Sequence, residues 1–166
     1  MSTRTRLLPL IGITVLALAA PRPAHAQFKF GPQLDWASQS IGFGVGARAE
    51  MSLDQYIPTV KGLGVNASFD YFFPGSSITF WEINADPTYH FAIPNVSFAP
   101  YVGAGLNLSH TSVSNCPFSG CSSTNAGLNL LVGTNFPALG KITPFAELRV
   151  EIRTGGAFVI TGGVLF

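Results

Sequence analysis

The stretch that decides the fold is FAELRVEIR, residues 145–153. Every second side chain in it is charged, and the side chains between them are apolar. Successive side chains of a β-strand point to opposite faces, so a strand here has one charged and one apolar face. The charged positions are Glu147, Arg149, Glu151 and Arg153, and the apolar ones between them are Leu148, Val150 and Ile152.

The same alternation recurs from residue 28 to residue 166, interrupted by turn-rich breaks. It divides this part of the chain into eight segments of about ten residues or slightly more, the length that a tilted strand needs to cross a bilayer. We expect strands at 28–37, 41–53, 63–73, 78–91, 99–112, 126–136, 142–154 and 157–166.

Charge is confined to one of the two faces that these strands define. Eleven charged residues lie on the polar face: Lys29, Asp35, Arg48, Glu50, Asp70, Glu82, Asp86, Glu147, Arg149, Glu151 and Arg153. The opposite face has none. Five apolar residues interrupt the polar face: Phe72, Leu131, Phe145, Val159 and Leu165.

This partition decides which face is inside. An apolar belt around eight strands is far larger than the patches that soluble monomers expose, and unpaired ions are costly in a soluble core. In a bilayer the apolar face points to lipid and the polar face to the lumen. We therefore predict an all-β, eight-stranded antiparallel transmembrane β-barrel. The soluble alternative, a secreted lipocalin-like carrier, needs an apolar cavity, which the charged face contradicts.

The N-terminus indicates export. Arg4 and Arg6 precede an apolar run over 7–20 and an Ala-His-Ala ending, the pattern of a secretory signal peptide. We expect residues 1–26 to be cleaved and residues 27–166 to form the barrel domain. The mature chain would then carry six basic and eight acidic residues, a net charge of −2. Such a chain has no basic patch for nucleic acid.

Three motifs resemble the small outer-membrane β-barrel family that includes the OmpA and OmpX barrels. They are Pro100-Tyr-Val-Gly-Ala-Gly-Leu106, Thr143-Pro-Phe-Ala-Glu147 and Thr161-Gly-Gly-Val-Leu-Phe166. The resemblance implies an outer-membrane location, contact with lipid and lipopolysaccharide, and insertion by the barrel-assembly machinery after escort by periplasmic chaperones. The terminal Phe166 resembles the signal that this machinery recognises. We expect a monomer with a structural or surface-interaction role.

Seven of the polar-face charges should lie in the lumen and form an ion-pair network. Eight strands enclose an interior just wide enough for side chains, where charges must pair. We predict a structural plug; the alternative is a narrow ion-conducting, porin-like path through rearranging pairs. The seven residues are Arg48, Glu50, Glu82, Glu147, Arg149, Glu151 and Arg153.

Two cysteines lie in the longest predicted outer connection, 113–125. Cys116 and Cys121 enclose four residues, and the cell envelope is an oxidising compartment. We predict a disulfide between them that ties the tip of this loop. A metal site would need more ligands than this pair offers.

One motif suggests an enzyme. His110-Thr111-Ser112 resembles the His-x-Ser of PagL-type lipid A deacylases, and both His110 and Ser112 have lipid-face parity. A catalytic triad also needs an acid to orient the histidine, and no Asp or Glu occupies that face. We therefore predict no catalysis, no cofactor and no metal, and keep the deacylase as the alternative. His90, alone on the lumen side, is expected to be a hydrogen-bonded plug residue.

Overall fold

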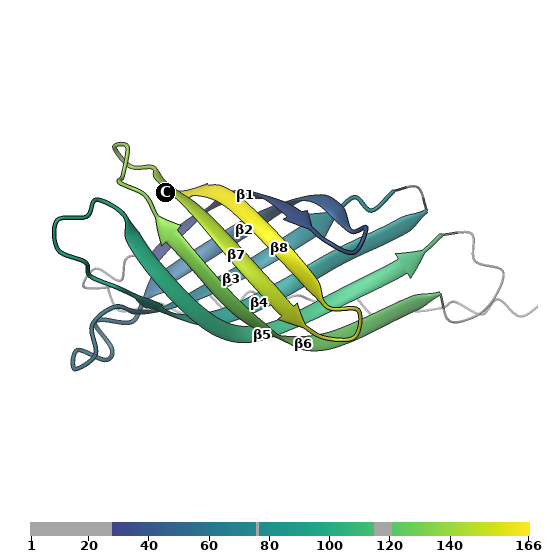
Figure 1. Cartoon of the computed structure of the whole chain (residues 1–166), viewed down its shortest axis with the longest axis horizontal. Helices are drawn as coiled ribbons and strands as arrows, with labels where there is room; N and C mark the ends of the chain where they lie inside the picture. Colours follow the sequence, from purple (N-terminus) through teal and green to yellow (C-terminus); the bar gives the residue numbers. More distant parts are fainter. Residues whose placement is uncertain (1–27, 76, 115–120) are drawn as a thin grey trace, which may run out of the picture.

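The computed structural model describes residues 28–75, 77–114 and 121–166, and these residues form a closed antiparallel barrel (Figure 1). The strands follow one another around the wall in chain order, and β1 also pairs with β8. They are β1 (Phe28–Ala37), β2 (Gly42–Ser52), β3 (Leu63–Phe72), β4 (Ile78–His90), β5 (Ala99–Val113), β6 (Ser122–Asn135), β7 (Thr143–Ile152) and β8 (Ala157–Leu165). The predicted eight-stranded fold is confirmed. No helix in the described ranges is long and apolar enough to span a membrane.

The expected strand bounds agree with the structure to within two residues, except where β6 begins. We expected a loop over 113–125, but β5 runs to Val113 and β6 starts at Ser122. Ser122–Asn125 pair with Ser109–Ser112 and extend this hairpin beyond β7, whose pairing with β6 begins at Leu128. The polar Ser-Ser-Thr-Asn run indicates a loop by composition, yet its backbone completes the ladder. The connection therefore shortens to residues 114–121.

The two ends of the barrel differ. What we call the terminal end carries the start of β1, the end of β8 and the connections 53–62, 91–98 and 136–142. The far end carries the connections 38–41, 73–77, 114–121 and 153–156. In Figure 1 the terminal end lies at the left, beside the C-terminus. Its connections extend well beyond the strands, so side chains from both wall and loops can meet there.

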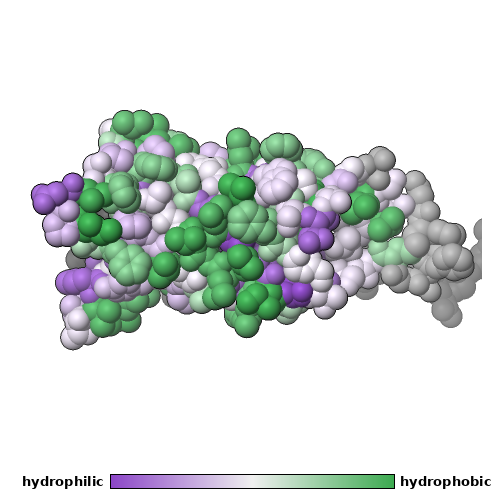
Figure 2. All heavy atoms as spheres, viewed as in Figure 1, coloured by the Kyte–Doolittle hydropathy of each residue, from purple (hydrophilic) through white to green (hydrophobic). Residues whose placement is uncertain are grey.

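The wall is apolar outside and polar inside. Leu34, Phe43 and Leu106 are 67%, 72% and 64% exposed, whereas Asp70 and Arg149 are 0% and 1% exposed. Figure 2 shows hydrophobic residues over the middle of the wall, with hydrophilic ones at the left end and to the right of the middle. This arrangement is the inverse of a soluble barrel and is that of a transmembrane one.

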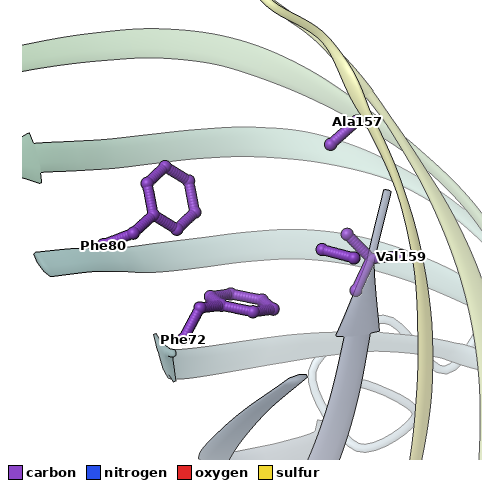
Figure 3. Packing of buried hydrophobic residues seen from close by; sticks show 5 residues of the cluster. Phe72, Phe80, Ala157 and Val159 are labelled. Carbon is purple, nitrogen blue, oxygen red and sulfur yellow. The ribbon is translucent and has the colours of Figure 1, made fainter. Parts of the chain in front are cut away.

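The lumen is apolar at the far end. Phe72 of β3 and Phe80 of β4 meet edge to face, with ring centroids 5.5 Å apart, and Val159 of β8 packs against them (Figure 3). Ala37 and Ala157 complete this far-mouth cluster, and all five side chains are buried. Two of the apolar residues that interrupt the polar face, Phe72 and Val159, thus belong to one buried cluster. They fill the far end of the lumen.

Candidate functional site

Arg149 lies at the centre of the lumen charges, projecting inward from β7. Its guanidinium approaches four carboxylates: Asp70 at 3.3 Å, Glu82 at 3.7 Å, Glu147 at 3.8 Å and Glu151 at 3.2 Å. The carboxylates come from β3, β4 and β7, so the guanidinium joins the two sides of the barrel. All five side chains are at most 3% exposed. A buried cation in this position offsets several charges that would otherwise be very costly.

Two further arginines extend the network toward the two ends. Arg153 lies 3.0 Å from Glu82 and 2.9 Å from Glu151, with its guanidinium over the ring of Phe80 in the far-mouth cluster. Arg48 of β2, nearer the terminal end, pairs with Glu147 and stands 4.5 Å from the Phe145 ring centroid. Both guanidinium groups therefore pair with carboxylates while their flat faces pack against aromatic rings.

Neutral polar side chains occupy the space between the charges. Asn84 donates to Asp70 at 3.0 Å and accepts from Asn107 at 2.8 Å and from Asn129 at 2.9 Å. Asn129 also donates to Asp86 at 2.9 Å. Three further donors reach carboxylates: Gln33 bonds Asp70, Thr161 bonds Asp35, and the Tyr101 hydroxyl bonds Glu147. Amide and hydroxyl donors thus supplement the few arginines.

Glycines on the polar face leave room for this crowding. An added Cβ at Gly133 would collide with the Tyr101 ring and hydroxyl, and would lie 2.8 Å from the Ala146 carbonyl oxygen. At Gly46 it would meet the Asp70 carboxylate. Each close approach lets a long side chain cross the narrow interior. The glycines of the polar face are therefore part of the site.

Glu50 is placed apart from the arginines. It accepts from Asn135 Nδ2 at 3.2 and 3.4 Å, and His90 Nε2 lies 3.8 Å from its Oε1. These residues line a cavity of about 340 Å³ at the terminal end, which we call the vestibule. His90, expected in a hydrogen-bonded role, contacts the Thr88 hydroxyl at 3.4 Å and packs near Tyr101.

The structure joins six of the seven predicted lumen charges in one chain of ion pairs. They are Arg48, Glu82, Glu147, Arg149, Glu151 and Arg153. Glu50 lies outside this chain of pairs. Our set omitted Asp70, which contacts Arg149, and Tyr101, which bonds Glu147. Asp70 has the same strand parity as the others, so parity alone would have included it. Tyr101 has the inward parity too, but the set was limited to charged residues.

The remaining predicted sites have different outcomes. Cys121 is described, but Cys116 lies outside the described residues, so the disulfide stays a prediction. The signal peptide over 1–26 lies outside them as well. In the ranges that the structure describes, no three His, Cys, Asp or Glu side chains are arranged to hold a metal ion.

The His110 motif lies on the lipid face, as expected. His110 Nδ1 contacts the Thr124 hydroxyl at 2.8 Å, and the imidazole stacks on Trp81 with ring centroids 5.2 Å apart. Thr124 thus occupies the position from which an acid would orient the imidazole. Ser112 is two residues along the same strand, opposite Thr79 of β4.

Comparison with solved structures finds barrels of the same kind. The N-terminal β-barrel domain of Pseudomonas aeruginosa OprF matches with a TM-score of 0.61 at 18% identity, covering 86% of this chain and 98% of that domain. Neisserial surface protein A matches with a TM-score of 0.59 at 20% identity, covering 83% and 94%. A major outer membrane protein of Thermus thermophilus matches with a TM-score of 0.50 at 16% identity, covering 86% and 99%.

Sequence comparison alone adds nothing to these matches. No protein-family model matches the chain, and no curated protein matches it. At 20% identity and below, structural likeness establishes the fold. The coverage is nearly complete on both sides, so the likeness extends over the whole closed wall. The chain therefore has the fold of the small eight-stranded outer-membrane β-barrels of the OmpA and OmpX type.

Proposed function

We propose that this protein is an integral outer-membrane barrel with a structural or surface-interaction role, exported through the periplasm and without catalytic activity. The observation that carries the proposal is the inverted wall, apolar outside and ionic inside. Membrane fractionation with gel mobility before and after boiling tests it. A folded barrel sediments with the outer membrane and changes mobility on heating. Recovery as a soluble periplasmic protein with unchanged mobility would contradict it.

The lumen is proposed to be plugged. Its support is the buried network around Arg149, continued at the far end by Phe72 and Phe80. Eight strands enclose an interior just wide enough for side chains to fill, and the side chains named here are paired and packed in it. Planar-bilayer recording of the purified barrel should give no reproducible conductance. Reproducible conductance that Arg149→Ala abolishes would instead support the porin-like alternative.

The far end is proposed to face the cell exterior and the terminal end the periplasm. The four connections at the far end are short and leave little surface for a partner. The longest of them is 114–121. A membrane-impermeant label tests the orientation. A cysteine at Gly155 should react on intact cells, whereas one at Lys141 should react only after the outer membrane is opened. The reverse pattern would overturn the assignment.

Phe166 is proposed to help the assembly machinery and its chaperones recognise the unfolded chain. In the barrel its main chain bonds Phe30, with N···O distances of 2.9 and 3.4 Å, while the side chain is half exposed on the lipid face. Phe166→Ala keeps both main-chain bonds, so a fall in inserted protein would report on recognition. Equal amounts of inserted wild-type and Phe166→Ala protein would contradict the proposed role of Phe166 in recognition.

The absence of catalysis is also proposed, on the grounds that His110 contacts Thr124 and stacks on Trp81. Mass spectrometry of lipid A from expressing cells tests it. We expect an unchanged acyl pattern. Loss of an acyl chain that depends on both His110 and Ser112 would establish the deacylase alternative.

A further inference from the structure

The vestibule is a cavity at the terminal end of the described barrel that the ion pairs do not fill, and several polar side chains line it. Its volume of about 340 Å³ lies at the lower end of the range for small-molecule sites. Residues of seven strands and three loops line it, among them Lys29 of β1, Glu50 of β2, His90 of β4 and Asn135 of β6. It has the dimensions and the wall chemistry of a ligand site.

One side of the vestibule is rich in hydrogen-bond acceptors. Asn135 is 8% exposed and its Oδ1 has no hydrogen-bond partner, although its Nδ2 donates to Glu50. Glu50 is 9% exposed, and the one hydrogen-bond donor that reaches it in the described part of the chain is that amide. A buried acceptor without a partner costs about 1–3 kcal/mol. Glu50 and Asn135 together therefore present oxygens suited to a group with several donors, such as an ammonium.

A cation borders the vestibule next to Glu50. Lys29 is directly opposite Glu50 in the β1–β2 register and has the same lumen-facing parity. Such opposed residues have Cβ atoms about 5 Å apart. Even so, among the described residues no carboxylate oxygen lies within 4.0 Å of the Lys29 ammonium. Lys29 borders one cavity with the carboxylates of Glu50 and Asp54 without pairing with either, and a ligand carboxylate can take the place that Glu50 leaves open.

We propose that the vestibule binds a small zwitterion, an amino acid or a short peptide. Glu50 and Asn135 Oδ1 accept from the ligand ammonium, and Lys29 donates to the ligand carboxylate. His90 lies beside this site, with its Nε2 3.8 Å from Glu50 Oε1. The inference goes beyond the proposed function, and the purified barrel tests it whichever compartment the terminal end faces.

Binding of alanine and dialanine to the folded barrel in lipid nanodiscs, followed by calorimetry and by the His90 imidazole NMR signal, is the direct experiment. Ethylamine and propionate carry each charge alone and serve as matched probes. We expect at least one zwitterion to bind saturably and each single-charge probe to bind about tenfold more weakly or worse. Stronger binding of alanine identifies a free amino acid, and stronger binding of dialanine a peptide.

Variants locate the site. Lys29→Met and Glu50→Gln should each weaken zwitterion binding by about tenfold, the loss of one charge-assisted bond. Lys29→Arg keeps the charge and should retain binding. Lys141→Met removes a cation from the same end of the barrel but outside the vestibule, and should leave zwitterion binding unchanged. Heat-dependent gel mobility shows that each variant is folded.

Three outcomes would overturn the proposal. The first is the absence of saturable binding of both zwitterions at millimolar concentration. The second is equal binding of ethylamine or propionate, which would make the site one for single charges. The third is zwitterion binding that persists in folded Lys29→Met and Glu50→Gln, which would place it elsewhere on the barrel. None of these results would affect the membrane fractionation that tests the proposed function.

Discussion

The middle of the lumen and the vestibule are built from the same kinds of residue, yet they satisfy their charges differently. Around Arg149, four carboxylates converge on one guanidinium and amides fill the remaining space. In the vestibule, the described residues give Glu50 one amide donor and a nearby histidine, and Lys29, opposite it in the ladder, forms no ion pair with it. The first region holds the wall together from inside. The second keeps unused hydrogen-bonding capacity next to an open cavity.

This contrast teaches that strand parity does not fix the role of a lumen charge. Parity places Glu50 and Glu147 alike on the inner face of the barrel. The position of a side chain along the barrel axis then decides whether an arginine is within its reach. Its distance from the barrel mouth decides whether water or a ligand can take the place of that arginine. Four substitutions probe how the lumen is held together, and their expected effects decrease from the middle of the barrel to the vestibule.

Arg149→Met should have the largest effect, because it leaves four buried carboxylates without their common cation. Breaking a buried ion pair by removing one partner costs about 3–5 kcal/mol. We expect the free energy of unfolding in urea, measured in lipid vesicles, to fall by that amount. Arg149→Lys, which keeps the charge but not the planar donor fork, should lose less. A loss below about 1 kcal/mol for Arg149→Met would mean that the network does not brace the wall.

Phe72→Ala should come next, because it empties the centre of the far-mouth cluster. Large-to-small substitution of a buried phenylalanine costs about 3–5 kcal/mol, and water entering from the mouth would place this one near 3. The unfolding experiment measures the loss. Phe43→Ala, on the exposed outer wall, is the matched control and should cost less in vesicles. Equal losses for the two variants would show that the far-mouth cluster contributes nothing of its own.

Gly133→Ala should have an intermediate effect, because the new methyl group collides with Tyr101. Overpacking a filled interior costs about 1–3 kcal/mol. Gly162→Ala is the matched control, since its methyl group would find its nearest neighbour, the Phe145 carbonyl oxygen, 4.0 Å away. Unfolding curves of the two variants should therefore separate. If they coincide, Tyr101 can move without loss and does not anchor Glu147.

Glu50→Gln should have the smallest effect on stability, below about 1 kcal/mol, because the vestibule is open and the amide can still bond Asn135. The same urea experiment gives the value. Glu147→Gln, in the closed middle of the lumen, is the comparison and should cost more, since it removes the partner of Arg48. A larger loss for Glu50→Gln than for Glu147→Gln would reverse the contrast between the two regions.

Much of the fold was predictable because it depends on a period of two. FAELRVEIR and its counterparts assign each residue to a face by simple alternation, and the eight strands agree with the structure except at the start of β6. There, Ser122–Asn125 carry a polar composition typical of loops, but their main chain pairs with β5. Backbone hydrogen bonding does not depend on side-chain polarity, so composition could not locate this boundary.

The site was predictable only in part. Six of the seven predicted lumen charges form one network, but parity could not show that Glu50 lies apart with Asn135 and His90. Nor could it show that Phe72 and Val159, apparent exceptions to the pattern, close the far end together with Phe80. These groupings join strands far apart in the sequence. They depend on the stagger between neighbouring strands, which sets the height of each side chain.

Alternation along the chain specifies the all-β wall, the number of strands and which side chains face inward, because it is a local property of the backbone. Which charges meet depends on the closed barrel. Closing β1 onto β8 with a particular register brings Arg149 within reach of acids on β3 and β4, and leaves Lys29 and Glu50 facing an open cavity. Ion pairing falls off within a few ångströms, so the register decides which lumen charges pair and which remain available.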